Sequence, residues 1–247
     1  MEQKIWNGLA ILWDCLKEMK NIPDASIDCI ITDPPYWKTA CKWDIVIPFD
    51  PMWEQIKRII KPNGAIVLFW SEPFSSALRM SNIKQYKYDW VWEKSQSRWH
   101  LLAYKRPMVK HELISIFNSK SYNPILSDKP LKDIRWFSKS WATEIYNNKT
   151  VCQSKTRKIP LDKKLPESIL KFNNEQRYEH PTQKPVALIE YLIKTYSFEW
   201  DTILDFTTWV WTTWIACENT KRKWICIKKD EEYYNLMCKR LSTGIFV

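Results

Sequence analysis

A chain of 247 residues with 45% hydrophobic and 15% aromatic residues can bury one large α/β core and is too apolar for a disordered polymer. No run reaches the roughly 18 apolar residues of a membrane helix, the N-terminus has no signal-peptide pattern, and the seven cysteines form no CxxC pair. We therefore expect a soluble cytoplasmic protein with no membrane partner, no disulfide framework and no metal site. The net charge of +10 indicates a polyanionic partner.

The chain up to about residue 117 contains apolar runs of strand length and helix-like segments. Asn63-Gly64 marks a turn between a helix and a strand. The elements predicted in this region are strands at 27–32, 65–69, 88–92 and 111–117, and a helix at 51–60.

The middle of the chain is strongly basic. Residues 94–172 hold 17 Lys+Arg against 6 Asp+Glu, whereas the remainder holds 21 against 22. Since all the excess positive charge lies in one segment, and that segment shows no amphipathic basic helix, DNA is favoured over a membrane as partner. We expect a DNA-recognition region at 94–173 inserted between two parts of a core, 1–93 and 174–247.

The last third returns to clean patterning. Its predicted elements are a helix at 185–196, a strand at 202–206, a helix near 212–219, a strand at 224–228 and a helix at 231–241. Strands that alternate with helices predict an α/β fold with a mostly parallel central sheet, covered by helices on both faces. Ligands of such sheets bind at the carboxyl ends of the strands.

The motif Asp33-Pro34-Pro35-Tyr36 follows the apolar strand at 27–32. The prolines fix the backbone and donate no hydrogen bonds, so the Asp33 carboxylate and the Pro34 carbonyl both present acceptors. Such a pair suits a planar ring that carries an NH₂ group, with Tyr36 free to stack on the ring. An ordinary strand end followed by a turn is the alternative.

With this motif the sequence resembles the S-adenosylmethionine-dependent DNA amino-methyltransferases, in which Asp-Pro-Pro-Tyr holds the target amine and is typical of adenine methylation. Two further blocks carry the resemblance, His180-Pro181-Thr182-Gln183-Lys184-Pro185 and Asp201-Thr202-Ile203-Leu204-Asp205-Phe206. Their order is similar to that of the permuted beta class. The resemblance implies a Rossmann-like methyltransferase fold with S-adenosylmethionine as cofactor and double-stranded DNA as substrate.

The same resemblance implies roles for individual residues. Asp33, Pro34, Pro35 and Tyr36 would hold a base that has been flipped out of the duplex, while the methyl group moves by direct displacement. The residues expected beside the cofactor are Asp205, Phe206, Thr207, Trp209, Trp211, Thr182, Lys184, Phe69 and Asp230. Ordinary structural roles remain open for several of them: helix capping for Asp205, a solvated helix start for Lys184 and core packing for Phe69.

The cofactor loop departs from the family pattern because tryptophan stands where relatives have glycine. The chain has only 3 glycines, about 1% against a usual 7%, and 16 tryptophans. We hypothesise that eleven of these tryptophans are UGA codons that the source organism reads as glycine. They are Trp13, Trp37, Trp70, Trp99, Trp136, Trp141, Trp200, Trp209, Trp211, Trp214 and Trp224. If the three loop indoles at 209, 211 and 214 are genuine, we expect them to fill the cofactor space.

The densest basic group comprises Arg98, His100, Lys105, Arg106 and Lys110, which we expect to contact DNA phosphates. The sequence thus predicts a site-specific DNA adenine methyltransferase of a restriction-modification, phage or orphan system, with a restriction endonuclease as a candidate partner. Three alternatives remain. They are methylation of the cytosine amine, which Asp rather than Ser before Pro-Pro argues against, an inactive DNA-binding relative if the loop tryptophans are genuine, and an RNA or protein amine methyltransferase.

Overall fold

The computed structural model describes residues 2–5, 7–35, 45–98, 100–130, 159–160, 162–174, 183–208 and 212–243. The chain divides into two compact units, residues 1–123 with 168–247, and residues 124–167. The smaller unit contains the antiparallel pair β7 (Ser127–Asp128) and β8 (Lys163–Lys164). The expected recognition region at 94–173 is therefore distributed over both units, because residues 94–123 fold with the larger one.

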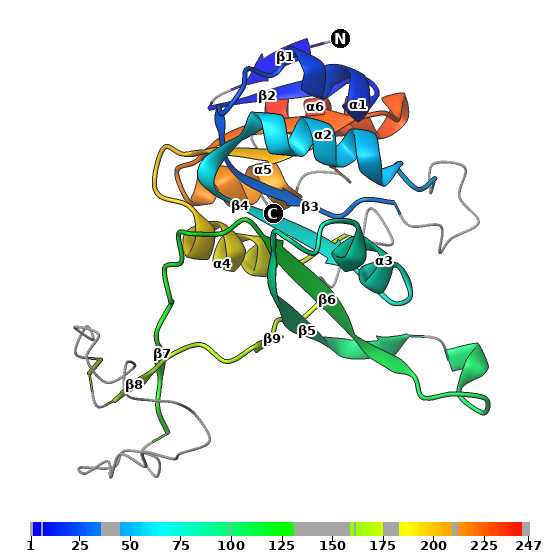
Figure 1. The fold of residues 1–247 in the computed structure, drawn as a ribbon, viewed down its shortest axis with the longest axis vertical. Coiled ribbons are helices and arrows are strands. Elements are labelled where there is room, and N and C mark those ends of the chain that lie inside the picture. The colour runs from blue at the N-terminus through cyan, green and yellow to red at the C-terminus, as the bar shows by residue number, and fades with distance from the viewer. Residues whose placement is uncertain are drawn as a thin grey trace. The chain divides into compact units, whose positions relative to one another are not determined.

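In the described residues of the larger unit, nine strands form one sheet in the order β1-β2-β11-β10-β3-β4-β6-β5-β9 (Figure 1). From β2 to β4 every neighbouring pair is parallel, whereas β1 and β6 run antiparallel to their neighbours. The strands are β1 (Glu2–Ile5), β2 (Gly8–Leu12), β3 (Ile27–Thr32), β4 (Ile60–Trp70), β5 (Tyr86–Arg98), β6 (Val109–Phe117), β9 (Ile169–Lys171), β10 (Thr202–Asp205) and β11 (Lys223–Lys228).

Six α-helices lie in the described residues, with short 3-10 turns at Met19–Asn21 (η1) and His100–Leu102 (η2). The helices are α1 (Cys15–Glu18), α2 (Phe49–Ile59), α3 (Phe74–Ser81), α4 (Val186–Tyr196), α5 (Thr212–Asn219) and α6 (Glu231–Thr243). Every helix and strand predicted from the sequence is confirmed, although several boundaries differ by a few residues and most predicted strands are longer than expected. The predicted turn at Asn63-Gly64 is wrong, because both residues lie within β4, which begins directly after α2. The sequence patterns missed β1, β2, α1, α3, β7, β8 and β9.

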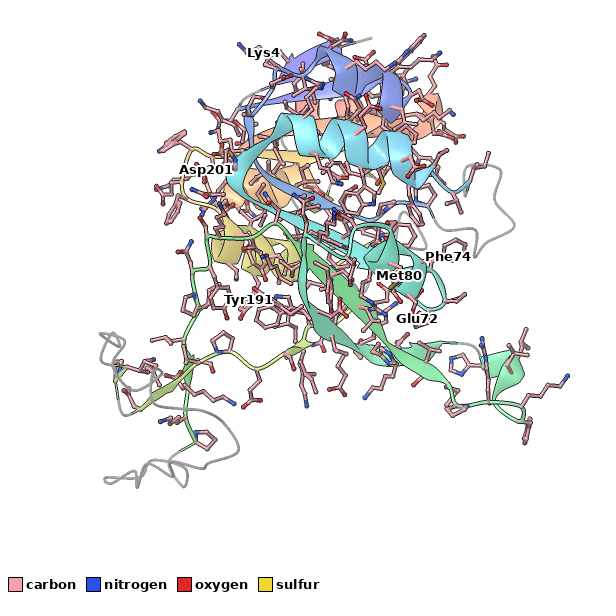
Figure 2. The ribbon with its side chains drawn as sticks, viewed as in Figure 1. Lys4, Glu72, Phe74, Met80, Tyr191 and Asp201 are labelled. Atoms are coloured by element: carbon pink, nitrogen blue, oxygen red, sulfur yellow. The ribbon has the colours of Figure 1, made fainter. Side chains whose placement is uncertain are left out.

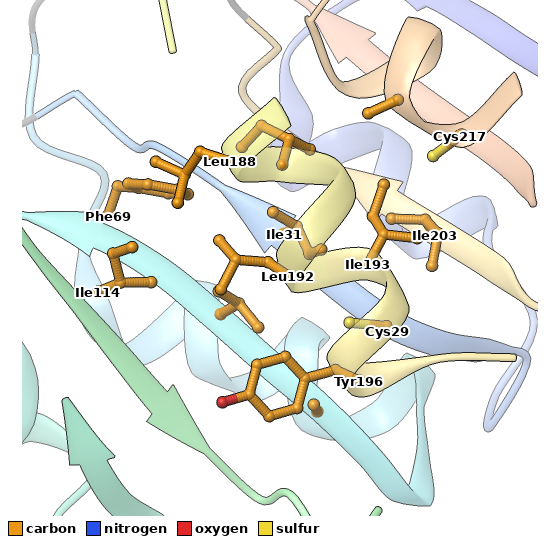
Figure 3. Packing of buried hydrophobic residues seen from close by; sticks show 14 of the residues in the cluster. Cys29, Ile31, Phe69, Ile114, Leu188, Leu192, Ile193, Tyr196, Ile203 and Cys217 are labelled. Atoms are coloured by element: carbon orange, nitrogen blue, oxygen red, sulfur yellow. The ribbon is translucent and has the colours of Figure 1, made fainter. Parts of the chain in front are cut away.

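Helices cover both faces of the sheet, as predicted. On one face, Leu188, Leu192 and Ile193 of α4 pack against Cys29 and Ile31 of β3 (Figure 3). These residues are buried because β3 lies in the middle of the sheet and alternate side chains point to opposite faces.

On the other face of the sheet, Ile30 of β3 packs in a second buried cluster with Met52 and Ile56 of α2. Helix α3 closes this face with Leu78, while its Met80 is exposed (Figure 2). A continuous apolar run such as Ile27–Thr32 is what a strand buried on both faces requires.

The order in which successive strands are added to the sheet reverses between β3 and β10. From β3 the chain passes through α2 to β4, the neighbour of β3 toward one edge of the sheet. From β10 it passes through α5 to β11, the neighbour of β10 toward the other edge. The carboxyl ends of the two adjacent parallel strands then border a crevice that no crossover helix covers. Asp33 follows β3 directly and Asp205 ends β10, so both sequence motifs lie at this switch point.

The tryptophans fall into different environments. Trp53, Trp90 and Trp92, which the glycine hypothesis treats as genuine, are buried, and each indole N–H donates a hydrogen bond of 2.6 to 3.0 Å. Trp200 is 58% exposed and has a φ of 71°, a conformation that glycine adopts readily and a bulky residue rarely does. Its backbone therefore supports the hypothesis that this position is suited to glycine.

Trp224 of β11, unlike the exposed Trp200, is buried in the core. It is 1% exposed, and its ring lies over Gly8 so closely that a Cβ on Gly8 would be 2.0 Å from the indole. The indole N–H donates to Glu218 over 2.8 Å. Trp224, one of the eleven suspected replacements, therefore has a packed place in the core, which exists because Gly8 has no side chain.

We predict that Trp200→Gly raises the free energy of unfolding by about 1 kcal/mol, because it relieves a side chain held in the left-handed region. Urea denaturation of both proteins measures this change. Phe198→Gly is the matched control, since Phe198 is 59% exposed, close to Trp200 in the chain and not at positive φ. It should lower the stability by about 0.5 to 1 kcal/mol. A loss of stability in Trp200→Gly would contradict the strain argument.

Candidate active site

The two sequence motifs are joined by a buried hydrogen bond. Thr32, the last residue of β3, donates its hydroxyl to Oδ1 of Asp205 over 2.7 Å, although 173 residues separate the two in sequence. Asp33 is 6% exposed and Asp205 4% exposed. A small cavity of about 20 Å³ is lined by Asp33, Asp205 and Lys184, among other residues. The proposed amine-binding acid and the end of the proposed cofactor strand therefore share one site.

Hydrogen-bond donors surround the Asp205 carboxylate. Besides Thr32, Oδ1 accepts from the backbone N–H of Thr207 over 3.2 Å, and Oδ2 accepts from the hydroxyls of Thr208 (2.8 Å) and Thr213 (2.6 Å). Burial raises the pKa of Asp205 and these donors oppose that increase. The carboxylate thus anchors the segment after β10 and the first turn of α5, and any contact with a cofactor stays a prediction.

Asp33 lies against a lysine. The ammonium of Lys184, just before α4, is 2.5 Å from Oδ2 of Asp33 and sits 5.4 Å from the centre of the Phe69 ring. Burial raises the pKa of Asp33 to about 6, and Glu112 adds to the increase, while Lys184 opposes it. The structure thus brings Lys184 and Phe69, two of the expected cofactor residues, to the acid of the Asp-Pro-Pro motif.

A cleft of about 440 Å³ opens beside these residues, at the carboxyl ends of β2, β10 and β11. This volume is within the usual range for small-molecule sites. Several predicted site residues line it together: Pro35, Phe206, Thr207 and Asp230. Pro35 belongs to the proposed base-binding motif and Phe206 to the proposed cofactor block, so the cleft joins the two halves of the site.

Asp14 is a cleft residue that the sequence analysis missed. Its Oδ1 caps α1 by accepting from the N–H of Leu16 over 3.1 Å, and its side chain lines the cleft opposite the β10 segment. Asp14 follows β2 by two residues, much as Asp33 follows β3, and an acid at the carboxyl end of a parallel strand indicates a ligand site. The sequence did not predict β2, so it did not predict Asp14 either.

The cleft suits the expected cofactor. Asp230 provides a carboxylate acceptor for hydroxyl or ammonium groups. Asp14 also lines the cleft, but its oxygens already accept from the Leu16 N–H and the Lys229 ammonium, and Phe206 lines the cleft although its side chain is only 1% exposed. Burial lowers the pKa of Lys228, at the end of β11, to about 8. The described lining, with Asp230 as acceptor, is compatible with a nucleoside that carries an amino-acid group.

Four of the predicted site residues, Tyr36, Thr182, Trp209 and Trp211, lie outside the described residues. Trp214 is described and is 1% exposed in the core, with its ring centre 6.3 Å from that of Trp224. It does not line the cleft, while Trp209 and Trp211 lie outside the described residues, so the expectation that the loop indoles fill the cofactor space stays a prediction. The Trp214 side chain enters the core because it projects from the first turn of α5 toward β11.

The predicted DNA-contacting residues gather on one hairpin. β5 and β6 form a long antiparallel pair that carries His100 in η2, Lys105 and Arg106 in the connecting turn, and Lys110 on β6 (Figure 1). All four are exposed, whereas the side chain of Arg98 lies outside the described part of the chain. Tyr104, which the sequence analysis did not single out, is also fully exposed in this turn.

The described helices are each too short or too polar to cross a lipid bilayer. Within the same residues, no group of three or more His, Cys, Asp or Glu side chains is arranged to hold a metal ion. Cys29, Cys217 and Cys226 are buried free thiols in the apolar core.

We predict that Thr213→Val lowers the free energy of unfolding by about 1 to 3 kcal/mol, because the buried Asp205 carboxylate loses one donor. Chemical denaturation at neutral pH is the measurement. Thr195→Val is the matched control: Thr195 is 1% exposed, but its hydroxyl donates only to the Tyr191 carbonyl of its own helix. Equal losses in the two variants would show that the Asp205 network contributes nothing specific.

Comparison with known proteins places this chain in a family. The family model of N6/N4 enzymes, described as DNA methylase, matches residues 27–239. The type II methyltransferase M.HpaI of Haemophilus parainfluenzae is 27% identical over 243 residues, which cover 93% of this chain and 73% of that protein. The DNA adenine methyltransferase YhdJ of Escherichia coli (strain K12) is 27% identical over 250 residues, covering 94% and 81%.

Solved structures support the same assignment at the level of the fold. The M1.HpyAVI–SAM complex has a TM-score of 0.62 at 23% identity, covering 94% of this chain and 98% of that one. The PvuII cytosine-N4-specific DNA methyltransferase has a TM-score of 0.66 at 15% identity, covering 96% and 87%. The predicted Rossmann-like methyltransferase fold is confirmed, and S-adenosylmethionine, the expected cofactor, is bound in the first of these structures. This chain belongs to the N6/N4 DNA methylase family of amino-methyltransferases.

Proposed function

We propose that the protein is a site-specific DNA methyltransferase that transfers the methyl group of S-adenosylmethionine to the exocyclic amine of adenine. The observation that carries the proposal is the position of Asp33, a buried carboxylate at the end of β3, beside a cleft lined by Pro35 and Phe206. The Asp-Pro-Pro-Tyr motif and the 27% identity to YhdJ, a protein named as an adenine methyltransferase, support adenine as the target.

In this mechanism Asp33 orients the amine and forms no covalent bond. Its carboxylate and the Pro34 carbonyl accept hydrogen bonds from the two amine protons, which directs the nitrogen lone pair toward the cleft. The Lys184 ammonium holds Oδ2 of Asp33 and so limits the rotation of the carboxylate. When bound, the cofactor supplies an electrophilic methyl group on a sulfonium.

The cofactor site in this proposal is the cleft between β2, β10 and β11. Asp230 would accept hydrogen bonds from the ribose hydroxyls or the amino group, and the chain at Phe206 and Thr207 would border the bound cofactor. Asp205 would act by holding the loop, because both of its oxygens already accept hydrogen bonds from this chain. Tyr36 is the proposed stacking partner of the flipped base.

Methylation of the cytosine amine is the second candidate, since the fold also matches that of the cytosine-N4-specific PvuII enzyme. The same acceptor pair would bind the cytosine amine. A restriction endonuclease is proposed as a genetic partner because relatives such as M.HpaI are named type II methyltransferases.

We predict that Asp33→Asn lowers kcat by about 100-fold or more without weakening cofactor binding, because the amide presents one acceptor fewer and adds a donor. Incorporation of labelled methyl groups into DNA measures kcat, and digestion of the product to nucleosides identifies the base. N6-methyladenine is the expected product, and N4-methylcytosine would favour the second candidate.

The matched control for this variant is Asp28→Asn, on the same strand. Asp28 pairs with Lys61 over 2.6 Å and accepts from the Thr202 N–H, away from the site. Its activity should be unchanged. A fully active Asp33→Asn would contradict the proposed role of the carboxylate.

We predict that the double variant Lys105→Ala/Arg106→Ala binds DNA more weakly and with a smaller dependence on salt. Loss of two phosphate contacts should reduce the slope of log K against log salt concentration by about 2. Fluorescence anisotropy at several salt concentrations measures the slope. Lys84→Ala/Lys87→Ala removes two exposed charges at the opposite end of the hairpin and serves as control. An unchanged slope in the first variant would exclude this turn from the DNA interface.

A further inference from the structure

Four buried charges of alternating sign extend from Asp33 into the sheet. The Lys184 ammonium lies 2.5 Å from Asp33 and 3.3 Å from Oε2 of Glu112 on β6, and Oε1 of Glu112 accepts a hydrogen bond from Lys94 on β5. The side chains of the four residues are only 5 to 13% exposed. Lys94 also lies over the Trp92 ring, 5.0 Å from its centre. We call Asp33, Lys184, Glu112 and Lys94 the charge chain.

Stability alone does not account for the charge chain. Removing charges from water costs several kcal/mol per ion, and well-packed apolar side chains in the same space are often at least as stable. Other ion pairs among the described residues are more exposed: the side chains of Lys221 and Glu199 are 63% and 57% exposed, and those of Arg79 and Asp89 are 20% exposed each. The charge chain is buried and ends on the acid of the Asp-Pro-Pro motif, which points to a role in the site.

Each residue of the charge chain contacts the next one, and these contacts restrain their charged groups. Lys184 has two anionic neighbours, so its position depends on the balance between Asp33 and Glu112. Lys94 engages the second oxygen of Glu112 and thereby restrains the carboxylate that Lys184 contacts. Glu112 comes from β6, where it pairs with Trp92 of β5, and Lys94 follows Glu93, the residue after which the register of the two strands shifts, so the inner end of the charge chain lies where the regular part of this strand pair ends.

We propose that Glu112, held by Lys94, is a positioning residue that fixes the Lys184 ammonium on Oδ2 of Asp33 and so sets the orientation and charge of the carboxylate that receives the substrate amine. The proposal rests on the proposed function, because it assigns Asp33 that task. It concerns this chain's own residues, and it can be tested in the protein without cofactor or DNA.

The charges that face Asp33 predict opposite effects for the two inner members of the chain. Lys184 and Lys94 lower the pKa of Asp33, whereas Glu112 raises it, and burial raises it most, giving a value of about 6. Asp205 is the other carboxylate that lines the small cavity with Asp33. Removing the charge of Glu112 should therefore lower the pKa of Asp33, and removing the charge of Lys94 should raise it.

The test follows the Asp33 carboxyl by carbon-13 NMR titration of the full-length protein labelled at aspartate, with Asp33→Asn used to assign the signal. The wild type should titrate near pH 6. Glu112→Gln should move the midpoint to lower pH and Lys94→Met should move it to higher pH. The charge-neutral double variant Lys94→Met/Glu112→Gln should return the midpoint toward that of the wild type, and it remains informative if either single variant folds poorly.

Activity provides the second readout. Because Lys184 loses its anchor, kcat of the double variant should fall by about 10- to 100-fold while KM for DNA and cofactor stays unchanged, as for a misplaced catalytic group. Asp89→Asn is the matched control: it breaks the 2.8 Å pair between Asp89 of β5 and Arg79 of α3, outside the site. The control should keep both the midpoint and kcat of the wild type.

Shifts of Glu112→Gln and Lys94→Met in the same direction, or a double variant with unchanged kcat, would overturn the proposal. A wild type that transfers no methyl group to DNA would instead overturn the proposed function, and the titration would still decide whether the charge chain sets the state of Asp33.

Discussion

The parallel pairing of β3 with β10 is the constraint on which the site depends. The two strands are adjacent in the sheet and their connections leave it in opposite directions, so their carboxyl ends border an open crevice. The hydrogen bond from Thr32 to Asp205 ties the strand ends together at 2.7 Å. Asp33 and the segment 206–208 follow from that junction, which under the proposed function gives the methyl acceptor and the methyl donor neighbouring sites.

The two buried acids at this junction, Asp33 and Asp205, have different partners. The Asp205 carboxylate accepts hydrogen bonds from hydroxyl and backbone donors and thereby holds the loop that borders the cleft. Asp33 pairs with the Lys184 ammonium, which also contacts Glu112 of β6. In the proposed mechanism Asp33 receives hydrogen bonds from the substrate amine, and this ammonium compensates its charge.

The described tryptophans differ in backbone conformation and in packing. The φ of 71° at Trp200 suits glycine, while Trp224 fills the space above Gly8 and makes a hydrogen bond to Glu218. Trp214 lies in the core and is not among the residues that line the cleft of about 440 Å³. The glycine hypothesis therefore finds support at one position and a well-packed indole at another.

The sequence by itself determined the family, the α/β class and the order of the main elements, because apolar periodicity and short motifs such as Asp33-Pro34-Pro35 are local properties of the chain. It also located the basic group at residues 98–110, since charge can be read directly, whereas the β5–β6 hairpin that carries this group comes from the structure. Only the tertiary structure decided that Lys184 contacts Asp33, that Glu112 and Lys94 stand behind it, and that Asp14 lines the cleft. These contacts join residues from distant strands, and the sheet order that brings them together follows from packing of the whole chain, which no single segment encodes.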